Sequence, residues 1–156
     1  MSRVRKNQRG FSLGELLVVV AIMGLVLLVA VPLVAEQIRA AEVRAAGDQL
    51  AMSLKAARMV AVSTHADVVF DIAVDPDNKY SYTDNKGRLR ETVVPPSVTI
   101  TSSDGDITFK QNGSIDSATA MDIVLEANMT GGEIDRWTIS TSILGVSTVD
   151  HYRYTP

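Results

Sequence analysis

A stretch of twenty uncharged residues, from position 16 to position 35, constrains this chain more than any other feature of its sequence. It consists almost entirely of Leu, Val, Ile, Met and Ala, and it is bounded by Glu15 and Glu36. As a helix with a rise of ~1.5 Å per residue, it is long enough to cover the ~30 Å hydrocarbon core of a bilayer. The sequence therefore predicts a membrane-spanning helix over residues 11–35.

Glu15 lies at the start of this apolar stretch. A carboxylate within a bilayer costs on the order of 2.5–3.5 kcal/mol, so an ionisable residue there favours a functional role. The alternative is that Glu15 marks the edge of the membrane and reaches the headgroups. The composition of the stretch does not decide between these two interpretations.

The first ten residues are basic. They contain four cations and no acid, and the cations are Arg3, Arg5, Lys6 and Arg9. The positive-inside rule predicts that this end stays in the cytoplasm and that the residues after the span are exported. A secretory signal peptide has its small-residue cleavage site after the apolar stretch, whereas Gly10 precedes it. Residues 1–10 are therefore expected to be a leader of another kind.

The segment Gly-Phe-Ser-Leu-Gly-Glu-Leu at residues 10–16, followed by the apolar stretch, resembles the leader junction of type IV pilins and pseudopilins. The resemblance implies that a membrane prepilin peptidase cuts between Gly10 and Phe11 and that Phe11 is then N-methylated. It also implies that Glu15 pairs with the N-terminal amine of a neighbouring subunit during assembly. This pairing is physically reasonable, because two charges in a low-dielectric environment are tolerated when they neutralise each other.

Four further residues bear on this resemblance. Gly24 and Pro32 fall where the family places helix-weakening residues, and Pro32 has no N–H to donate within a helix. Gly14 departs from the family pattern, which usually has a large aliphatic residue there, and Ser12 replaces the more common Thr. Neither departure alters the Gly-Phe junction or Glu15.

Charge and cysteine content exclude several classes of function. The formal charge of the chain is −3, and removal of a leader of charge +4 leaves −7. An exported domain this acidic does not favour general binding of phosphates. The chain has no cysteine, so disulfides, thiolate metal sites and cysteine nucleophiles are excluded.

Residues 36–65 predict the amphipathic second half of the same helix, because they are rich in good helix formers. Small and apolar residues recur there at steps of three and four: Val43, Gly47, Leu50, Leu54, Ala57 and Ala61. This stripe is expected to pack on the protein's own head domain, closely where the residues are small. Packing against other filament helices is the alternative.

Residues 66–156 predict a β-rich head of seven or eight short antiparallel strands. Strands are expected at residues 68–74, around Tyr80 and Tyr82, at 88–94, 98–101, 107–110 and 121–126, around Trp137, and at 146–154. Asn112-Gly113 predicts a type I′ turn. The fold class is therefore α+β: a long N-terminal transmembrane helix packed on a small antiparallel β head.

The head segments at residues 107–114 and 137–146 resemble the H-type minor pseudopilins of type II secretion and the FimT/FimU-like minor pilins, together the GspH/FimT type. The resemblance implies the pilin fold and a structural subunit, a minor pilin or pseudopilin, of a type IV pilus or a type II secretion pseudopilus. It implies no enzymatic activity and no cofactor. The implied partners are the prepilin peptidase, other pilins or pseudopilins and an inner-membrane assembly platform. The implied location is the bacterial inner membrane, crossed once with the head in the periplasm, and then the filament.

Two other kinds of site are weaker hypotheses. Asp75 with Asp77, and Asp104 with Asp106, supply oxygen atoms suited to Ca²⁺, but neither pair belongs to an EF-hand pattern and both are typical of turns. Whether calcium binds at either pair is left open by the sequence. No motif of a hydrolase, a zinc protease or a nucleotide-binding loop occurs, so no catalytic residue is expected.

A DNA- or surface-binding subunit at the filament tip is the alternative function. Tyr152 and Tyr154 are suited to stacking on bases, but the last eight residues contain only one Arg and one Asp. Four cations lie in or beside the segment between the strands expected around Tyr80 and at 88–94: Lys79, Lys86, Arg88 and Arg90. A solvated face is favoured there over a small basic patch. A third interpretation, an ordinary single-span protein that is never cleaved, predicts an intact leader.

Overall fold

The longest element of the protein is a single helix, α1, Leu13–Thr64. The computed structural model describes residues 11–156, apart from the side chains of Val29, Pro32, Leu33 and Ser102. The chain divides into two units, Met1–Ala35 and Glu36–Pro156. Among the residues whose side chains the structure describes, no helix is long and apolar enough to cross a membrane.

The C-terminal end of α1 is closed by local hydrogen bonds. His65 adopts a left-handed conformation with φ of 51°. The Ala66 N–H then donates to the Ala61 carbonyl over 3.3 Å, and the Thr64 hydroxyl donates to the Val60 carbonyl over 2.7 Å. The first bond satisfies one of the last four carbonyl groups of the helix, and the second adds a side-chain bond to its last turn. The end near Thr64 agrees with the sequence prediction.

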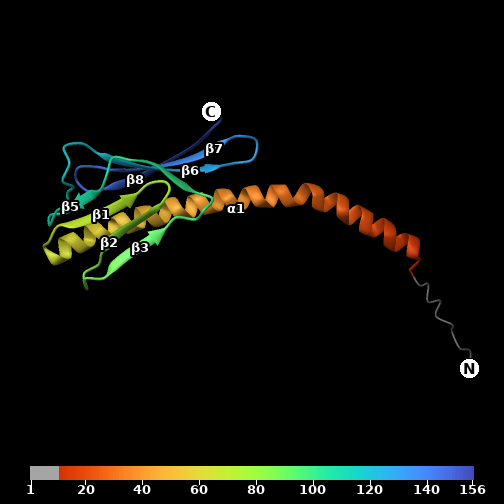
Figure 1. Ribbon diagram of the computed structural model, residues 1–156, viewed down its shortest axis with the longest axis horizontal. Coiled ribbons are helices and arrows are strands. Elements are labelled where there is room, and N and C mark those ends of the chain that lie inside the picture. The colour runs from red at the N-terminus through yellow and green to blue at the C-terminus, as the bar shows by residue number, and fades with distance from the viewer. Residues whose placement is uncertain (1–10) are drawn as a thin grey trace, which may run out of the picture. The chain divides into compact units, whose positions relative to one another are not determined.

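Eight strands follow α1, and Figure 1 shows them gathered along its second half. They are β1 Val68–Ala73, β2 Lys79–Thr83, β3 Leu89–Val93, β4 Thr99–Ser103, β5 Ile107–Phe109, β6 Met121–Asn128, β7 Ile134–Thr141 and β8 Ser147–Tyr154. They form two four-stranded sheets, ordered β3-β2-β1-β5 and β4-β6-β7-β8, and every pairing is antiparallel. The antiparallel head was predicted from the sequence, whereas its division into two sheets was not.

The apolar stripe of α1 is the side of the helix that packs into the head. Its members at positions 43, 50, 54, 57 and 61 are all fully buried. They share one core with side chains from both sheets, among them Phe70 and Ile107 from the first and Ile100, Leu125 and Ile139 from the second. The prediction that this stripe packs on the protein's own head is confirmed.

Gly47 allows the sheet to approach the helix closely. A Cβ atom at this position would lie 2.9 Å from Cε3 of Trp137 on β7, closer than carbon atoms pack. The indole therefore lies directly against the helix backbone. The expectation that small residues mark a close approach is confirmed at this position.

Arg58 joins α1 to two turns at the far end of the head. Its Nε donates to the Gly113 carbonyl over 2.9 Å. A Cβ atom at Gly145, in the turn between β7 and β8, would lie 2.0 Å from that same carbonyl oxygen and 3.0 Å from Arg58 Nε. Gly145 has φ of 73°, so both its conformation and its surroundings require glycine.

The turn before Gly113 differs from the predicted type I′ turn. The Gly113 N–H donates to the Lys110 carbonyl over 2.7 Å, so Gln111 and Asn112 are the central residues. A type I′ turn needs positive φ at both central residues. Among the described non-glycine residues only His65 and Asn78 have positive φ, and Gly113 carries the left-handed conformation with φ of 82°. The type I′ assignment was therefore wrong, because the turn begins one residue earlier than predicted and places Asn112 third and Gly113 fourth.

Asp84 organises the hairpin between β2 and β3. Its carboxylate accepts hydrogen bonds from the backbone N–H groups of Lys86 and Arg88 over 2.8 and 3.0 Å. It also accepts the Nε groups of Arg88 and Arg90, each over 3.0 Å. The backbone bond from Arg88, followed by that from Lys86 and the two guanidinium groups, holds the pKa of Asp84 well below its usual range.

We predict that Gly47→Ala destabilises the protein, although alanine ordinarily stabilises a helix by about 1 kcal/mol relative to glycine. The new methyl group collides with Trp137, and overpacking of this kind costs about 1–3 kcal/mol. Urea unfolding of the full chain in detergent measures the change. In a Trp137→Leu background the same substitution should become neutral or stabilising, and an unchanged penalty there would contradict the proposed collision.

We predict that Asp84→Asn lowers stability at pH 7 and still lowers it, by a smaller amount, at pH 3. Because the pKa of Asp84 is depressed in the folded protein, its contribution is complete above the unfolded pKa of ~3.9, declines below that value and is lost only as the pH approaches the depressed folded-state pKa. Urea midpoints of wild type and variant at both pH values measure the difference. Asp77→Asn, on another turn, is the matched control, and an equal effect at both pH values would contradict the prediction.

Candidate functional site

The N-terminus of α1 forms a capping box. The Glu15 N–H donates to Ser12 Oγ over 3.2 Å, and the Ser12 N–H donates to Glu15 Oε2 over 3.0 Å. The two side chains thus satisfy backbone donors that the first turn of a helix leaves free. Glu15 therefore has a structural role within its own subunit. The sequence analysis missed it, although the signal, a Ser three residues before a Glu and ahead of an apolar run, was present.

Phe11 precedes this cap and is 80% exposed. Gly10, the other residue of the expected cleavage junction, lies outside the described residues. Gly14 has open space around it, since an added Cβ would meet only Ser12 Oγ at 3.8 Å. The departure from the family pattern at Gly14 is therefore not enforced by packing within the chain.

Large apolar side chains are exposed along the first unit, and Leu13, Leu17, Leu25 and Val31 are examples. Within the described residues from Phe11 to Ala35, Glu15 is the only charged side chain. α1 is continuous through position 32 and through Gly24, around which an added Cβ would meet nothing within 4 Å. Weakening of the helix at Gly24 and Pro32 stays a prediction.

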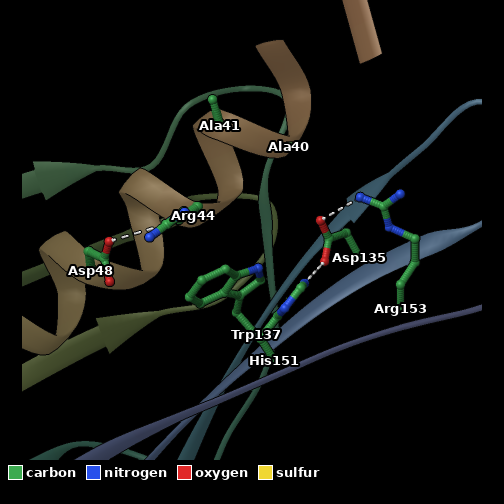
Figure 2. Close-up of a pocket in the computed structure, with 8 residues that line it drawn as sticks. All are labelled: Ala40, Ala41, Arg44, Asp48, Asp135, Trp137, His151 and Arg153. Atoms are coloured by element: carbon green, nitrogen blue, oxygen red, sulfur yellow. Dashed lines mark hydrogen bonds and ion pairs between the residues drawn. The ribbon is translucent and has the colours of Figure 1, made fainter. Parts of the chain in front are cut away.

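A groove in the head is a second candidate site (Figure 2). It has a volume of about 520 Å³ and lies between α1 and the strands β7 and β8. Eight residues line it: Ala40, Ala41, Arg44, Asp48, Asp135, Trp137, His151 and Arg153. Side chains alternate between the two faces of a strand, which explains why these strand residues lie together. Residues 135 and 137 of β7 face the helix, as do their cross-strand partners 153 and 151 of β8.

Asp135 is the buried charge of this groove, with a side chain only 3% exposed. His151 Nε2 lies 2.6 Å from Asp135 Oδ1, and Arg153 Nη2 lies 3.4 Å from Asp135 Oδ2. Arg153 also approaches Glu133 within 3.7 Å and Glu36 of α1 within 3.9 Å. The interactions compensate the cost of burying a carboxylate and connect the last strand to the helix.

Trp137 and His151 form the aromatic part of the groove. Their ring centroids are 4.6 Å apart, and Figure 2 shows the indole between α1 and the histidine. Trp137 Nε1 is buried and has no hydrogen-bond acceptor among the described residues. Among the described residues that line the groove, none is a serine, threonine or cysteine. The sequence analysis noted Trp137 only as a strand residue and missed this cluster, because cross-strand register brings it together.

The four aspartates considered for calcium binding lie in turns. Asp75 accepts a hydrogen bond from Asn78 Nδ2 over 3.2 Å. Asp104 accepts the Asp122 N–H over 2.8 Å, and Asp106 accepts the Ile72 N–H over 3.0 Å. Within residues 11–156, no group of three or more acidic, histidine or cysteine side chains is placed to hold a metal ion.

Three of the four cations considered for DNA binding lie beside acids. Lys79 Nζ lies 3.2 Å from Glu91 Oε2, and Arg88 and Arg90 both contact Asp84. No ion pair of Lys86 occurs among the described residues. The hairpin therefore has less free positive charge than the sequence indicated.

The two C-terminal tyrosines are held by Arg136. Its Nη1 donates to the Tyr152 hydroxyl over 2.9 Å, and its Nη2 donates to the Tyr154 hydroxyl over 2.8 Å. The guanidinium carbon lies 4.9 Å from the centroid of the Tyr154 ring, and Arg136 also pairs with Glu126. These side chains form an ordered polar cluster on the outer face of the second sheet.

Comparison with known proteins places this architecture in a family. The prokaryotic N-terminal methylation motif matches residues 5–31, and the model of the type II transport protein GspH matches residues 46–145. Two crystal structures of the type IV minor pilin FimU from Pseudomonas aeruginosa are similar in fold. The first has a TM-score of 0.53 and 19% sequence identity, and the match covers 71% of this chain and 88% of the FimU chain. The second has a TM-score of 0.51 and 20% sequence identity, and the match covers 70% of this chain and 91% of the FimU chain.

Among curated proteins, none matches this chain. The likeness to FimU confirms the expected pilin fold, a helix packed on antiparallel β-sheet. Because the GspH model covers more than half of the sequence, the chain belongs to the GspH family of type II transport proteins, which are pilin-like structural subunits rather than enzymes.

Proposed function

We propose that this protein is cleaved between Gly10 and Phe11 by a prepilin peptidase, is methylated on Phe11, and enters a filament as a minor pseudopilin or pilin. The type II secretion pseudopilus is the first candidate, because the family model that matches the head is that of a type II transport protein. A type IV pilus is the second candidate, on the basis of the fold shared with FimU.

The observation that carries this proposal is the position of Glu15. It is the one charge in an otherwise uncharged segment of 25 residues whose large side chains are mostly exposed in the single chain. Its Oε2 accepts the Ser12 N–H, and no hydrogen bond to Oε1 occurs among the described residues. One carboxylate oxygen thus completes the subunit's own cap, while the other is available to an amine.

Cleavage before Phe11 would create such an amine at the start of α1. A positive charge there is unfavourable beside the positive end of the helix dipole, and a carboxylate from a neighbouring subunit would neutralise it. Each subunit then supplies one amine and accepts another. Both charges can be buried between packed helices because each has its partner.

The exposed apolar side chains of the first unit support insertion before assembly. We place residues 11–35 across the inner membrane, residues 1–10 in the cytoplasm and the head in the periplasm, as the basic leader predicts. During assembly the same side chains would leave lipid and pack against other stem helices. DNA binding has no comparable support, because Lys79, Arg88 and Arg90 are each beside an acid.

We predict that protein purified from its own membrane has lost residues 1–10 and gained one methyl group, ~14 Da, on Phe11. Intact-mass measurement followed by sequencing of the N-terminal peptide provides the test. Replacement of Gly10 by a bulkier residue should slow the cleavage, since the peptidase must accommodate the residue before the cut. A full-length, unmethylated chain would refute processing and leave an ordinary membrane anchor.

We predict that Glu15→Gln is cleaved normally but enters filaments roughly ten-fold less or worse, because an unpaired buried charge costs about 3–5 kcal/mol. Gln at this position preserves the capping box, so the variant removes the charge and keeps the cap. Immunoblots of membrane and sheared-filament fractions give the ratio. Ser12→Ala, which weakens the cap and retains the charge, is the matched control and should assemble nearly as wild type. Normal incorporation of Glu15→Gln would exclude the charge pairing.

A further inference from the structure

The two sheets of the head have four edge strands, and these are not equally protected. An edge strand presents unpaired backbone groups that can bind another chain, so proteins usually shorten, bulge or charge their edges. β5 has three residues, β4 has a register shift between Ile100 and Ser102, and β3 is a short strand with Arg90 and Glu91 at its centre. β8 pairs with β7 over eight residues without a shift.

Few features of β8 protect its free edge. It contains no proline, and its one cation, Arg153, approaches Asp135, Glu133 and Glu36. All six central residues of the strand are exposed. Among the described strands, β8 is therefore the one best suited to accept a further strand.

The hairpin geometry identifies the backbone groups that are available. The Ser142 N–H donates to the Val146 carbonyl over 2.9 Å, which makes these residues a hydrogen-bonded pair. Such pairs alternate along an antiparallel ladder. Residues 148, 150 and 152 therefore bond to β7, whereas residues 147, 149, 151 and 153 direct their N–H and C=O groups to the free edge.

The groove of Figure 2 lies beside this edge. Side chains at positions 151 and 153 point into it from β8, and Ala40 and Ala41 leave space on the α1 side. A strand added to β8 would direct alternate side chains toward this space. Its volume of about 520 Å³ is large enough for apolar side chains.

Charge indicates which segment would bind. Residues 1–35 hold four cations and one acid, so a chain of formal charge −3 leaves −6 on residues 36–156. Asp150, on the outer face of β8, is exposed and has no ion pair among the described residues. Opposite charges stabilise cross-strand pairs, whereas a second copy of this acidic head would be repelled.

We propose that β8 accepts an extended segment of a different, neighbouring subunit as a fifth strand of its sheet. The segment carries apolar side chains toward the groove and a basic side chain beside Asp150. This inference rests on the proposed function, because filament assembly is what brings a neighbouring subunit to this edge. It adds a main-chain contact between heads to the contact made by the stem helices.

The test compares Val149→Pro with Val149→Ala in the full chain, expressed in its own cells with the rest of the assembly machinery. Proline removes an N–H that faces the free edge, whereas alanine keeps it. We expect Val149→Pro to reduce incorporation into sheared filaments roughly ten-fold, because one backbone hydrogen bond to the added strand is lost and the bonds next to it are weakened. We expect the incorporation of Val149→Ala to remain within about two-fold of wild type. Fluorescence of Trp137, the single tryptophan, verifies that each variant is folded.

A second pair of variants keeps the proposal testable if proline disturbs the strand. Val149→Lys adds a charge to the β8 edge, and Val93→Lys adds the same charge to the β3 edge, where Val93 is 65% exposed. Only Val149→Lys should lose incorporation. Equal behaviour of the two lysine variants, or normal incorporation of both Val149→Pro and Val149→Lys, would overturn the inference while wild-type incorporation still supports the proposed function.

Size-exclusion chromatography of the purified full chain in detergent tests the identity of the occupant. We expect the wild-type chain to elute as a monomer and Val149→Lys to elute at the same volume. A dimer that Val149→Lys dissociates would show that a second copy occupies the edge and would overturn the assignment to a different subunit. Absence of the wild-type chain from filaments would instead refute the proposed function, and this inference with it.

Discussion

Burial of one face of α1 is the interaction on which the head depends. Neither four-stranded sheet is closed on itself, and each covers part of its apolar surface with the stripe that runs from Val43 to Ala61. Without cysteines no disulfide can substitute for this contact. A buried leucine such as Leu50 or Leu54 contributes on the order of 2–5 kcal/mol to such a core, a large part of the stability of a small domain.

The two halves of α1 have different surfaces: the second half packs against the head, and the first half exposes large apolar side chains. In the second half the buried face carries Ala, Gly and Leu, and Gly47 is small enough for Trp137 to lie against the backbone. In the first half large apolar side chains are exposed all around, and the one charge, Glu15, is placed in the first turn where it also caps the helix. The residue that we propose to act between subunits thus also caps the helix of its own subunit, so its position would be constrained in two ways.

Local patterns in the sequence predicted much of this structure. The helical period predicted the buried stripe and its end near Thr64, and β-branched alternation predicted the strands. Pairing over long sequence distances was not predictable, because nothing local to β4 or β5 indicates that β4 pairs with β6 and β5 with β1. The groove was not predicted either, because Asp135 and His151 come together only through the register of β7 and β8.

Two contacts that were not predicted are local in the sequence. In the β2–β3 hairpin, Asp84 binds Arg88 and Arg90, where the sequence had left a small basic patch and a solvated face as alternatives. The capping box at Ser12 and Glu15 was overlooked because the resemblance to pilins had already assigned Glu15 a different role. In both cases an acidic side chain is bonded to residues no more than six positions away along the chain.

The contact among Arg58, Gly113 and Gly145 limits how this head can diversify. The path of the β7–β8 turn is fixed by a carbonyl oxygen that leaves no room for a side chain at position 145. The neighbouring Ile143 and Leu144 are exposed and meet no such restriction. Substitutions at these two positions can therefore change the chemistry displayed at this end of the molecule without altering the backbone that displays it, so that a new surface requires no new fold.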